Sequence, residues 1–289
     1  MKVDFFIVGA PKAGTTSLYH YLNEHPQIEM SLQKEPDYFS DKEIQIQGLY
    51  YSKNRIDTEE KYNGLFNTQK KDVIFGEGSV SYLFYPTVAQ DIKVYNPMAK
   101  IIIMLRNPIE RAFSHYLMDY RLGLVSDSFE DIINKKSKHK NAHLFYQQYI
   151  KVGEYAAQLK RYCDIFDKKN ILLIDYENFK SDVTGTMNSA YSFLNISAEF
   201  SVDINKKHNT FTMPKNKLIR FVYSFVIIRN ILSFIFPKNI IKAVRLILFT
   251  KDKKPKLLEE TRNQLKHYFS NDVRLLGNLI GKDYSKWIQ

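Results

Sequence analysis

The chain has 289 residues, of which 44% are hydrophobic, and a formal net charge of +11. This length and composition suffice for one α/β domain with a buried core and exclude a disordered chain or a collagen. The single cysteine, Cys163, excludes an internal disulfide, and the histidines lack metal-ligand spacing, so a metal-free mechanism in a reducing compartment, the cytoplasm, is expected.

The N-terminal segment is predicted to form a strand, a tight turn and a helix. An apolar run at 5–8, interrupted before it by Asp4, is a poor signal peptide and a good first strand. The turn Gly9-Ala10-Pro11-Lys12-Ala13-Gly14 then leads into a helix predicted over 17–23. Unpaired N–H groups and the positive end of the helix dipole meet there, so we predict an anion site.

The same turn matches only half of a Walker A loop. Gly9 and Gly14 have the expected spacing, but Thr15 stands where a nucleotide triphosphatase has its lysine, and the lysine is at position 12. Thr15, Thr16 and Ser17 add hydroxyl donors. The pattern favours a phosphate-bearing donor other than magnesium-ATP.

Further along the chain, predicted strands alternate with predicted helices. We expect strands within 27–39 and at 73–76, 100–105 and 170–175, helices at 87–95, 109–121 and 154–166, and a polar, tyrosine-rich loop through Gln69. The strand at 100–105 ends at Arg106-Asn107-Pro108, and the helix after it returns Ser114 and His115 toward that end. The alternation predicts a single α/β domain over 1–289, with a central parallel sheet that binds ligands at its carboxyl edge.

The basic excess is concentrated between residues 204 and 251, which contain ten lysines and arginines and no acidic residue. Such a segment faces phosphates, an acidic polymer or a lipid surface, or is only a solvated face. Within it, 218–249 is predicted as two amphipathic helices broken at Pro237. Charges interrupt it too often for a membrane span, so we favour packing on the core or on a partner subunit over peripheral membrane contact.

Four motifs in register resemble the sulfotransferases that use 3′-phosphoadenosine 5′-phosphosulfate (PAPS). They are KAGTTSLYHYL, HPQI, KEPDYF and IIIMLRNPIERAFSHYL, and the similarity extends to the C-terminal segment that begins LEETRNQLKHYF. The chain looks most similar to bacterial carbohydrate sulfotransferases and to heparan-sulfate-type sulfotransferase domains. The resemblance implies a P-loop-like three-layer fold.

The resemblance also implies a donor site that needs no metal and releases adenosine 3′,5′-bisphosphate. The 5′-phosphosulfate would be bound by the turn residues Lys12, Ala13, Gly14, Thr15, Thr16 and Ser17. Arg106 and Ser114 match the family's 3′-phosphate site, and a guanidinium with a hydroxyl suits a dianion. Tyr176 resembles a tyrosine that contacts adenine. The alternatives are that Arg106 pairs with an acid such as Glu110 and that Tyr176 caps the core.

Glu35 in KEPDYF stands where the carbohydrate branch has its base on the acceptor hydroxyl. Partial burial would raise its pKa usefully. The alternative is that Glu35 pairs with Lys34 or Lys12 and only shapes the loop. The resemblance gives Lys12 a second role, stabilising charge on the bridging oxygen, and Lys34 a contact with the departing phosphate or an anionic acceptor.

Four further positions are interpreted by comparison with the family's pattern. His208 and Asn209 either cover the nucleotide or form a polar turn. Gly78 stands where related domains often carry lysine, so a second substrate-side cation is not expected there. His115 is interpreted as structural, because it points away from Ser114 on its helix.

The predicted function is in-line transfer of a sulfuryl group from PAPS to a hydroxyl or amino group of a carbohydrate, polysaccharide or glycolipid. Nucleic acid is not an expected partner, and the oligomeric state is left open. The expected location is cytoplasmic or peripheral at the inner membrane face. Two rival functions are a P-loop kinase, with 171–175 as its Walker B strand, and a non-enzymatic binder of nucleic acid or anionic membrane through 204–251.

Overall fold

The computed structural model describes residues 2–51, 54–67, 69–203, 212–215, 219, 248–250 and 255–289. The predicted amphipathic helices at 218–249 therefore lie outside the described residues, apart from positions 219, 248 and 249. Within the described ranges, no helix combines the length and apolar character needed to cross a bilayer.

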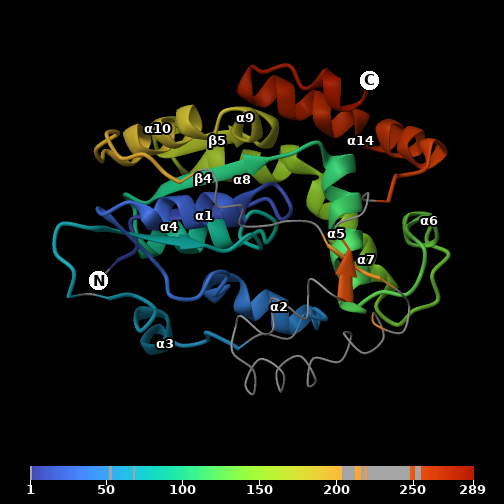
Figure 1. Ribbon diagram of the computed structural model, residues 1–289, viewed down its shortest axis with the longest axis horizontal. Coiled ribbons are helices and arrows are strands. Elements are labelled where there is room, and N and C mark those ends of the chain that lie inside the picture. Colours follow the sequence, from blue (N-terminus) through green and yellow to red (C-terminus); the bar gives the residue numbers. More distant parts are fainter. Residues whose placement is uncertain are drawn as a thin grey trace.

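A five-stranded parallel sheet forms the centre of the molecule (Figure 1), with the strand order β2-β3-β1-β4-β5. The strands are β1 (Phe5–Gly9), β2 (Ile28–Met30), β3 (Ile74–Gly78), β4 (Lys100–Leu105) and β5 (Ile171–Asp175). Every residue of β1 is buried, and so is every residue of β4 after Lys100. Central parallel strands are covered on both faces, which explains their continuous apolar sequences.

Helices flank this sheet and connect its strands. They are α1 (Thr15–Glu24), α2 (Asp41–Gln47), α3 (Glu59–Asn63), α4 (Val88–Tyr95), α5 (Pro108–Leu122), α6 (Phe129–Ile133), α7 (Ala142–Tyr149), α8 (Tyr155–Ile165), α9 (Tyr176–Ser181), α10 (Val183–Leu194) and α14 (Glu259–Ile280). Helix α1 packs against α10, and α8 packs against both α4 and α14. Two short strands, β6 (Met213–Pro214) and β7 (Phe249–Thr250), pair antiparallel. The predicted α/β fold with a central parallel sheet is confirmed.

The structure corrects two predictions about local structure. The segment through Gln69 was predicted as loop, but it contains α2, α3 and a single 3-10 turn at Tyr38–Ser40. Helix α1 begins at Thr15 rather than at Ser17. Gly14 is its N-cap and takes a left-handed conformation (φ 95°), so the helix starts at the next residue.

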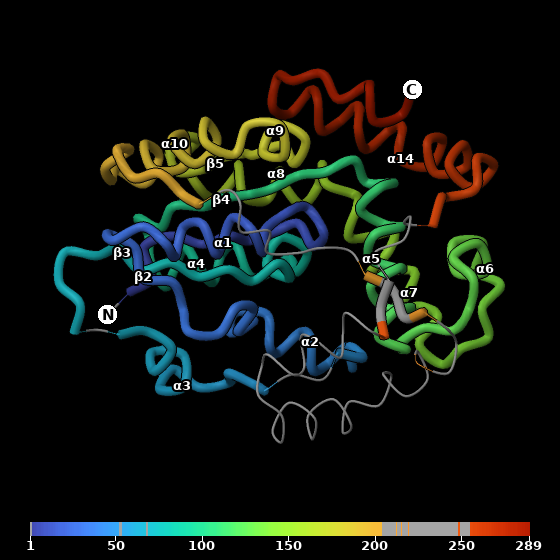
Figure 2. Tube along the Cα trace, in the orientation of Figure 1, coloured from blue at the N-terminus to red at the C-terminus, as the bar shows by residue number. Residues whose placement is uncertain are grey.

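The carboxyl edge of the sheet is enclosed by α5, α7 and α2. Figure 2 shows the chain leaving β4 and turning into α5 beside α7. Gln47, the last residue of α2, accepts a bond from Tyr85 (2.8 Å) and donates one to Gln147 of α7 (2.6 Å). Helices α2 and α7, whose contacting residues are 100 positions apart in the sequence, thus form one side of the space at the strand ends.

Candidate active site

The turn between β1 and α1 forms an open cradle at the sheet edge. Lys12 (φ 66°) and Gly14 (φ 95°) are both left-handed, and the Ala10 N–H donates to the Met104 carbonyl of β4 at 2.7 Å. Among the described residues no side-chain hydrogen bond caps α1, so the first N–H groups of the helix point out of its end. A Cβ on Gly14 would lie 3.0 Å from the Tyr176 ring. Glycine is therefore needed at this position both for the left-handed backbone and for the close approach of Tyr176.

Arg106 follows β4 and reaches across to this cradle. Its Nη1 donates to the Lys12 carbonyl at 3.0 Å, and its guanidinium carbon lies 4.5 Å from the centroid of the Tyr176 ring. Its Nε is buried and has no hydrogen-bond partner among the described residues. Glu110, the alternative partner considered above, instead accepts from Arg262 at 2.8 Å.

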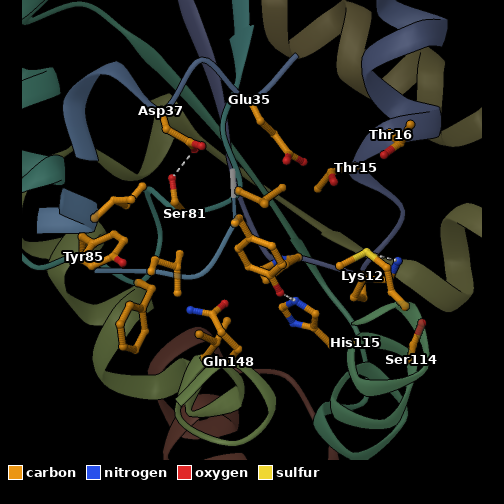
Figure 3. A pocket seen from close by; sticks show the side chains of 18 of the residues that line it. Lys12, Thr15, Thr16, Glu35, Asp37, Ser81, Tyr85, Ser114, His115 and Gln148 are labelled. Atoms are coloured by element: carbon orange, nitrogen blue, oxygen red, sulfur yellow. Dashed lines mark hydrogen bonds between the residues drawn. The ribbon is translucent and has the colours of Figure 1, made fainter. Parts of the chain in front are cut away.

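The helix after Arg106 is placed by its N-terminal cap. The Asn107 side chain accepts from the N–H of Ile109 at 2.9 Å, and Pro108 occupies the first helical position, as expected of a helix start. This cap fixes the start of α5. Ser114 lies about two turns further along the helix and lines the cavity near Lys12 (Figure 3).

Glu35 lies on a loop tied to the end of β3. Its backbone is left-handed (φ 60°), and its N–H donates to the Gly78 carbonyl at 2.9 Å. Its carboxylate forms an ion pair with Lys34, the pairing that sequence analysis gave as the structural alternative. The side chain nevertheless faces the cavity that the cradle opens into (Figure 3), so the ion pair does not remove it from the site.

One cavity of about 760 Å³ brings these residues together. Of the predicted site residues, those that line it are Lys12, Gly14, Thr15, Thr16, Ser17, Glu35, Arg106, Ser114 and Tyr176. Ala13 and Lys34 do not line it: Ala13 is fully buried, and its N–H donates to the Ala10 carbonyl at 3.2 Å. His208 and Asn209 lie outside the described residues.

Lys12 is a half-buried cation that lines the cavity. Desolvation, with smaller contributions from the charges of Arg121 and Arg106, lowers its pKa to about 8, and the charges of Asp119 and Glu35 oppose the shift. Its Nζ lies 3.5 Å from the sulfur of Met118. A lysine desolvated in this way interacts strongly with an incoming anion, because little water screens the charge.

Sequence reasoning missed a buried polar network beside the cavity, which it reaches through Tyr51. Asp119 is fully buried and accepts bonds from the hydroxyls of Tyr50 (2.6 Å), Tyr51 (2.9 Å) and Tyr149 (2.8 Å). Burial raises its pKa to about 6, which these hydroxyls and the charge of Lys12 oppose. No local pattern could have revealed it, since its members are 30 to 69 residues from Asp119.

His115 belongs to the same network and lines the cavity, so its interpretation as a structural residue pointing elsewhere was incomplete. Its Nε2 lies 2.7 Å from the Tyr51 hydroxyl, and its Nδ1 lies 3.3 Å from the guanidinium of Arg111. Burial, with the charges of Arg111 and Lys12, lowers its pKa well below the usual value. His115 is therefore neutral at pH 7.

Comparison with known proteins identifies relatives of this chain. Human carbohydrate sulfotransferase 15 is 29% identical over 243 residues, which cover 66% of this chain and 43% of that protein. The bifunctional heparan sulfate N-deacetylase/N-sulfotransferase 1 of Caenorhabditis briggsae is 26% identical over 201 residues, covering 67% of this chain and 22% of that protein. The chain thus spans less than half the length of both.

A solved structure and a family model agree with these matches. The crystal structure of a sulfotransferase from Alicyclobacillus acidocaldarius aligns with a TM-score of 0.73 and 29% sequence identity, covering 100% of both chains. The model of the sulfotransferase domain matches residues 2–224, which contain every described residue named in the cavity. The chain belongs to the sulfotransferase family.

Proposed function

We propose that this protein transfers a sulfuryl group from PAPS to a hydroxyl or amino group of a carbohydrate. The proposal rests on one observation. Arg106, Ser114 and Glu35 line the same cavity as the cradle with its Lys12. The names of the two curated relatives, a carbohydrate and a heparan sulfate sulfotransferase, support the class of acceptor.

The cavity suits a nucleotide with phosphates at both ends. The buried Nε of Arg106 lacks a hydrogen-bond partner among the described residues, and a guanidinium that keeps donors available fits a phosphate. Arg106 and Ser114 would hold the 3′-phosphate, while Lys12, Thr15, Thr16, Ser17 and the first N–H groups of α1 would hold the 5′-phosphosulfate. Tyr176, stacked on Arg106, offers its ring to the adenine.

Glu35 and Lys12 would act on the two oxygens between which the sulfuryl group moves, the acceptor oxygen and the 5′-phosphate oxygen. PAPS supplies a sulfuryl group: the bond from sulfur to the acceptor oxygen forms as the bond from sulfur to the 5′-phosphate oxygen breaks. Glu35 takes the proton of the acceptor hydroxyl as that oxygen loses electron density, and Lys12 stabilises the charge on the leaving phosphate. The cavity would also accelerate transfer by holding the donor and the acceptor in the orientation that in-line transfer requires.

The test is to measure binding and turnover separately. The protein with EDTA should bind adenosine 3′,5′-bisphosphate, and with isotope-labelled PAPS it should label members of a panel of capsule-type glycans, read by mass spectrometry. Glu35→Gln should abolish labelling and leave nucleotide affinity intact, whereas Glu60→Gln, at an exposed position of α3, should change neither. Magnesium-dependent phosphate transfer from ATP would instead support a kinase.

A further inference from the structure

Glu35 lies on a loop whose backbone conformation is unfavourable. Glu35 (φ 60°) and Asp37 (φ 56°) are both left-handed, and Figure 3 shows their side chains on one loop at the cavity. Residues with a Cβ adopt this conformation at a cost in free energy and keep it where their surroundings fix it. The position of the Glu35 carboxylate therefore depends on what holds the loop.

Backbone bonds to β3 place the first part of this loop. The N–H of Ser31 donates to the Gly76 carbonyl, and that of Glu35 donates to the Gly78 carbonyl, both at 2.9 Å. Between these two glycines lies Glu77, whose side chain is fully buried. The loop is thus fixed by main-chain bonds as far as Glu35, and side chains hold the residues that follow.

Two hydroxyl groups connect the second part of the loop to Glu77. The Ser79 hydroxyl accepts from the Asp37 N–H at 2.9 Å and donates to Oε1 of Glu77 at 2.5 Å. The Tyr82 hydroxyl accepts from the Phe39 N–H at 3.2 Å and donates to Oε2 of Glu77 at 3.1 Å. The two oxygens of one carboxylate thus anchor two backbone positions of the loop.

The direction of these bonds requires Glu77 to accept on both oxygens. A hydroxyl has one hydrogen, so when it accepts from the loop its own hydrogen needs a second acceptor behind it. The Tyr62 hydroxyl also donates to Oε2, at 2.7 Å. Burial raises the pKa of Glu77 to about 7, and the three hydroxyl bonds oppose this shift because they stabilise the anion. The ionised form keeps both linking hydroxyls turned so that they accept from the loop.

The linking residues lie behind the loop rather than in the site. Glu77, Ser79 and Tyr82 are all fully buried, and none of them is among the described residues that line the cavity. A change at these positions therefore reaches a ligand in the described cavity through the residues that line it, such as Glu35.

We propose that Glu77 is a positioning residue: through two hydroxyl groups it holds the loop in the conformation that directs the Glu35 carboxylate at the acceptor. This inference rests on the proposed function, in which Glu35 is the base. The position of a base matters because a displacement of about 1 Å in a reacting group can slow a reaction about a hundredfold.

The first test removes each link separately. Ser79→Ala and Tyr82→Phe each delete one hydroxyl, and kinetics are measured at pH 7.5, above the pKa of Glu77, with PAPS and the glycan that the unaltered protein labels best. We expect kcat to fall at least about tenfold in both variants. The KM for PAPS and the affinity for adenosine 3′,5′-bisphosphate should change less than about threefold, because the donor residues are untouched.

Tyr62→Phe is the matched control. It deletes a third hydroxyl bond to the same carboxylate, but among the described residues that hydroxyl makes no bond to the loop. Its kcat should therefore stay within about twofold of that of the unaltered protein. A purely structural role of the network would instead lower kcat in all three hydroxyl variants alike.

The second test is Glu77→Gln, which keeps the shape but places an amide donor among hydroxyls that themselves donate. We expect kcat to fall at least about tenfold, again with nucleotide affinity retained. Because Glu77 acts through Ser79, the loss of kcat in the double variant with Ser79→Ala should be smaller than the product of the two single losses.

The outcomes separate this inference from the proposed function. An unaltered protein that neither binds the bisphosphate nor labels any glycan overturns the proposed function. With an active unaltered protein, three results each overturn the positioning role alone: unchanged kcat in both Ser79→Ala and Tyr82→Phe, an equal fall of kcat in Tyr62→Phe, or multiplicative losses in the double variant. If Glu77→Gln does not fold, the three hydroxyl variants decide.

Discussion

The Arg106 guanidinium stacks on the Tyr176 ring, with its central carbon 4.5 Å from the ring centroid. The contact joins the ends of two neighbouring strands, because Arg106 follows β4 and Tyr176 follows β5. A planar cation on a ring face keeps its in-plane donors directed outward, toward a ligand. The stack therefore holds both residues in the orientation in which the proposed nucleotide would meet them.

Replacement of Arg106 tests the 3′-phosphate assignment. Arg106→Lys keeps a charge but loses the forked donors and the stacking, so we expect affinity for adenosine 3′,5′-bisphosphate to fall at least about tenfold, as for loss of a charged hydrogen bond. Titration calorimetry measures it. Affinity for adenosine 5′-monophosphate, which lacks the 3′-phosphate, should change little. An equal loss for both ligands would contradict the assignment.

Glu110 provides the control for this experiment. Its carboxylate pairs with Arg262, not with Arg106, and the pair is partly exposed. Such pairs contribute about 0–1 kcal/mol to stability. Glu110→Gln should therefore leave nucleotide affinity unchanged.

The aromatic ring of Tyr176, rather than its hydroxyl, is expected to matter. Tyr176→Phe should keep affinity for the bisphosphate within about threefold, whereas Tyr176→Ala removes a cation–π contact of about 0.5–2 kcal/mol together with the surface for adenine. A double-mutant cycle of Arg106→Lys and Tyr176→Ala, measured by calorimetry, should give non-additive losses. Additive losses would show that the two side chains act independently.

The parts of this site that sequence predicted are those built by local chain geometry. The apolar run at 101–105 is typical of a buried strand, and Arg106-Asn107-Pro108 ends it and starts a helix, so Arg106 and Ser114 were expected at the carboxyl edge. The cradle at 12–17 follows in the same way from β1 and Gly14. Because strand ends of a parallel sheet share one edge, these pieces meet in one cavity.

The parts that were missed have no local signal. Helix α2 has no buried residue and exposes Ile46, so hydrophobic periodicity could not reveal it; Gly48 ends it in a left-handed conformation. The network around Asp119 depends on tyrosines from distant segments. His115 was placed away from the site because neighbours on a helix point about 100° apart, yet the cavity is wide enough to contact both it and Ser114.

The lowered pKa of Lys12 predicts how nucleotide binding depends on pH. Burial brings this pKa to about 8, so the side chain loses its charge as pH rises through 8. By one-proton linkage, affinity for the bisphosphate should fall by up to about tenfold between pH 7 and pH 9. Lys12→Arg, which stays protonated, should flatten this profile. Calorimetry in two buffers at pH 8.5 should detect proton uptake on binding, and its absence would contradict the assignment.

The buried carboxyl group of Asp119 predicts an unusual dependence of stability on pH. Its pKa in the fold, about 6, exceeds the unfolded value near 3.9, so between these values the native state holds a proton that the unfolded chain has lost. Its contribution is greatest below pH 4 and declines by up to about 1.4 kcal/mol per pH unit as pH rises toward 6.

Asp119→Asn, which does not titrate, isolates that contribution. The variant should be destabilised by about 1–3 kcal/mol at pH 7, since three tyrosine hydroxyls lose a charged acceptor, and by more at pH 4.5. Urea unfolding of both proteins at pH 4.5, 5.5 and 7 measures the difference, with Asp164→Asn as an exposed control. A destabilisation that grows with pH would mean that the network holds Asp119 as an anion with a depressed pKa, and that Lys12 and the tyrosines outweigh burial.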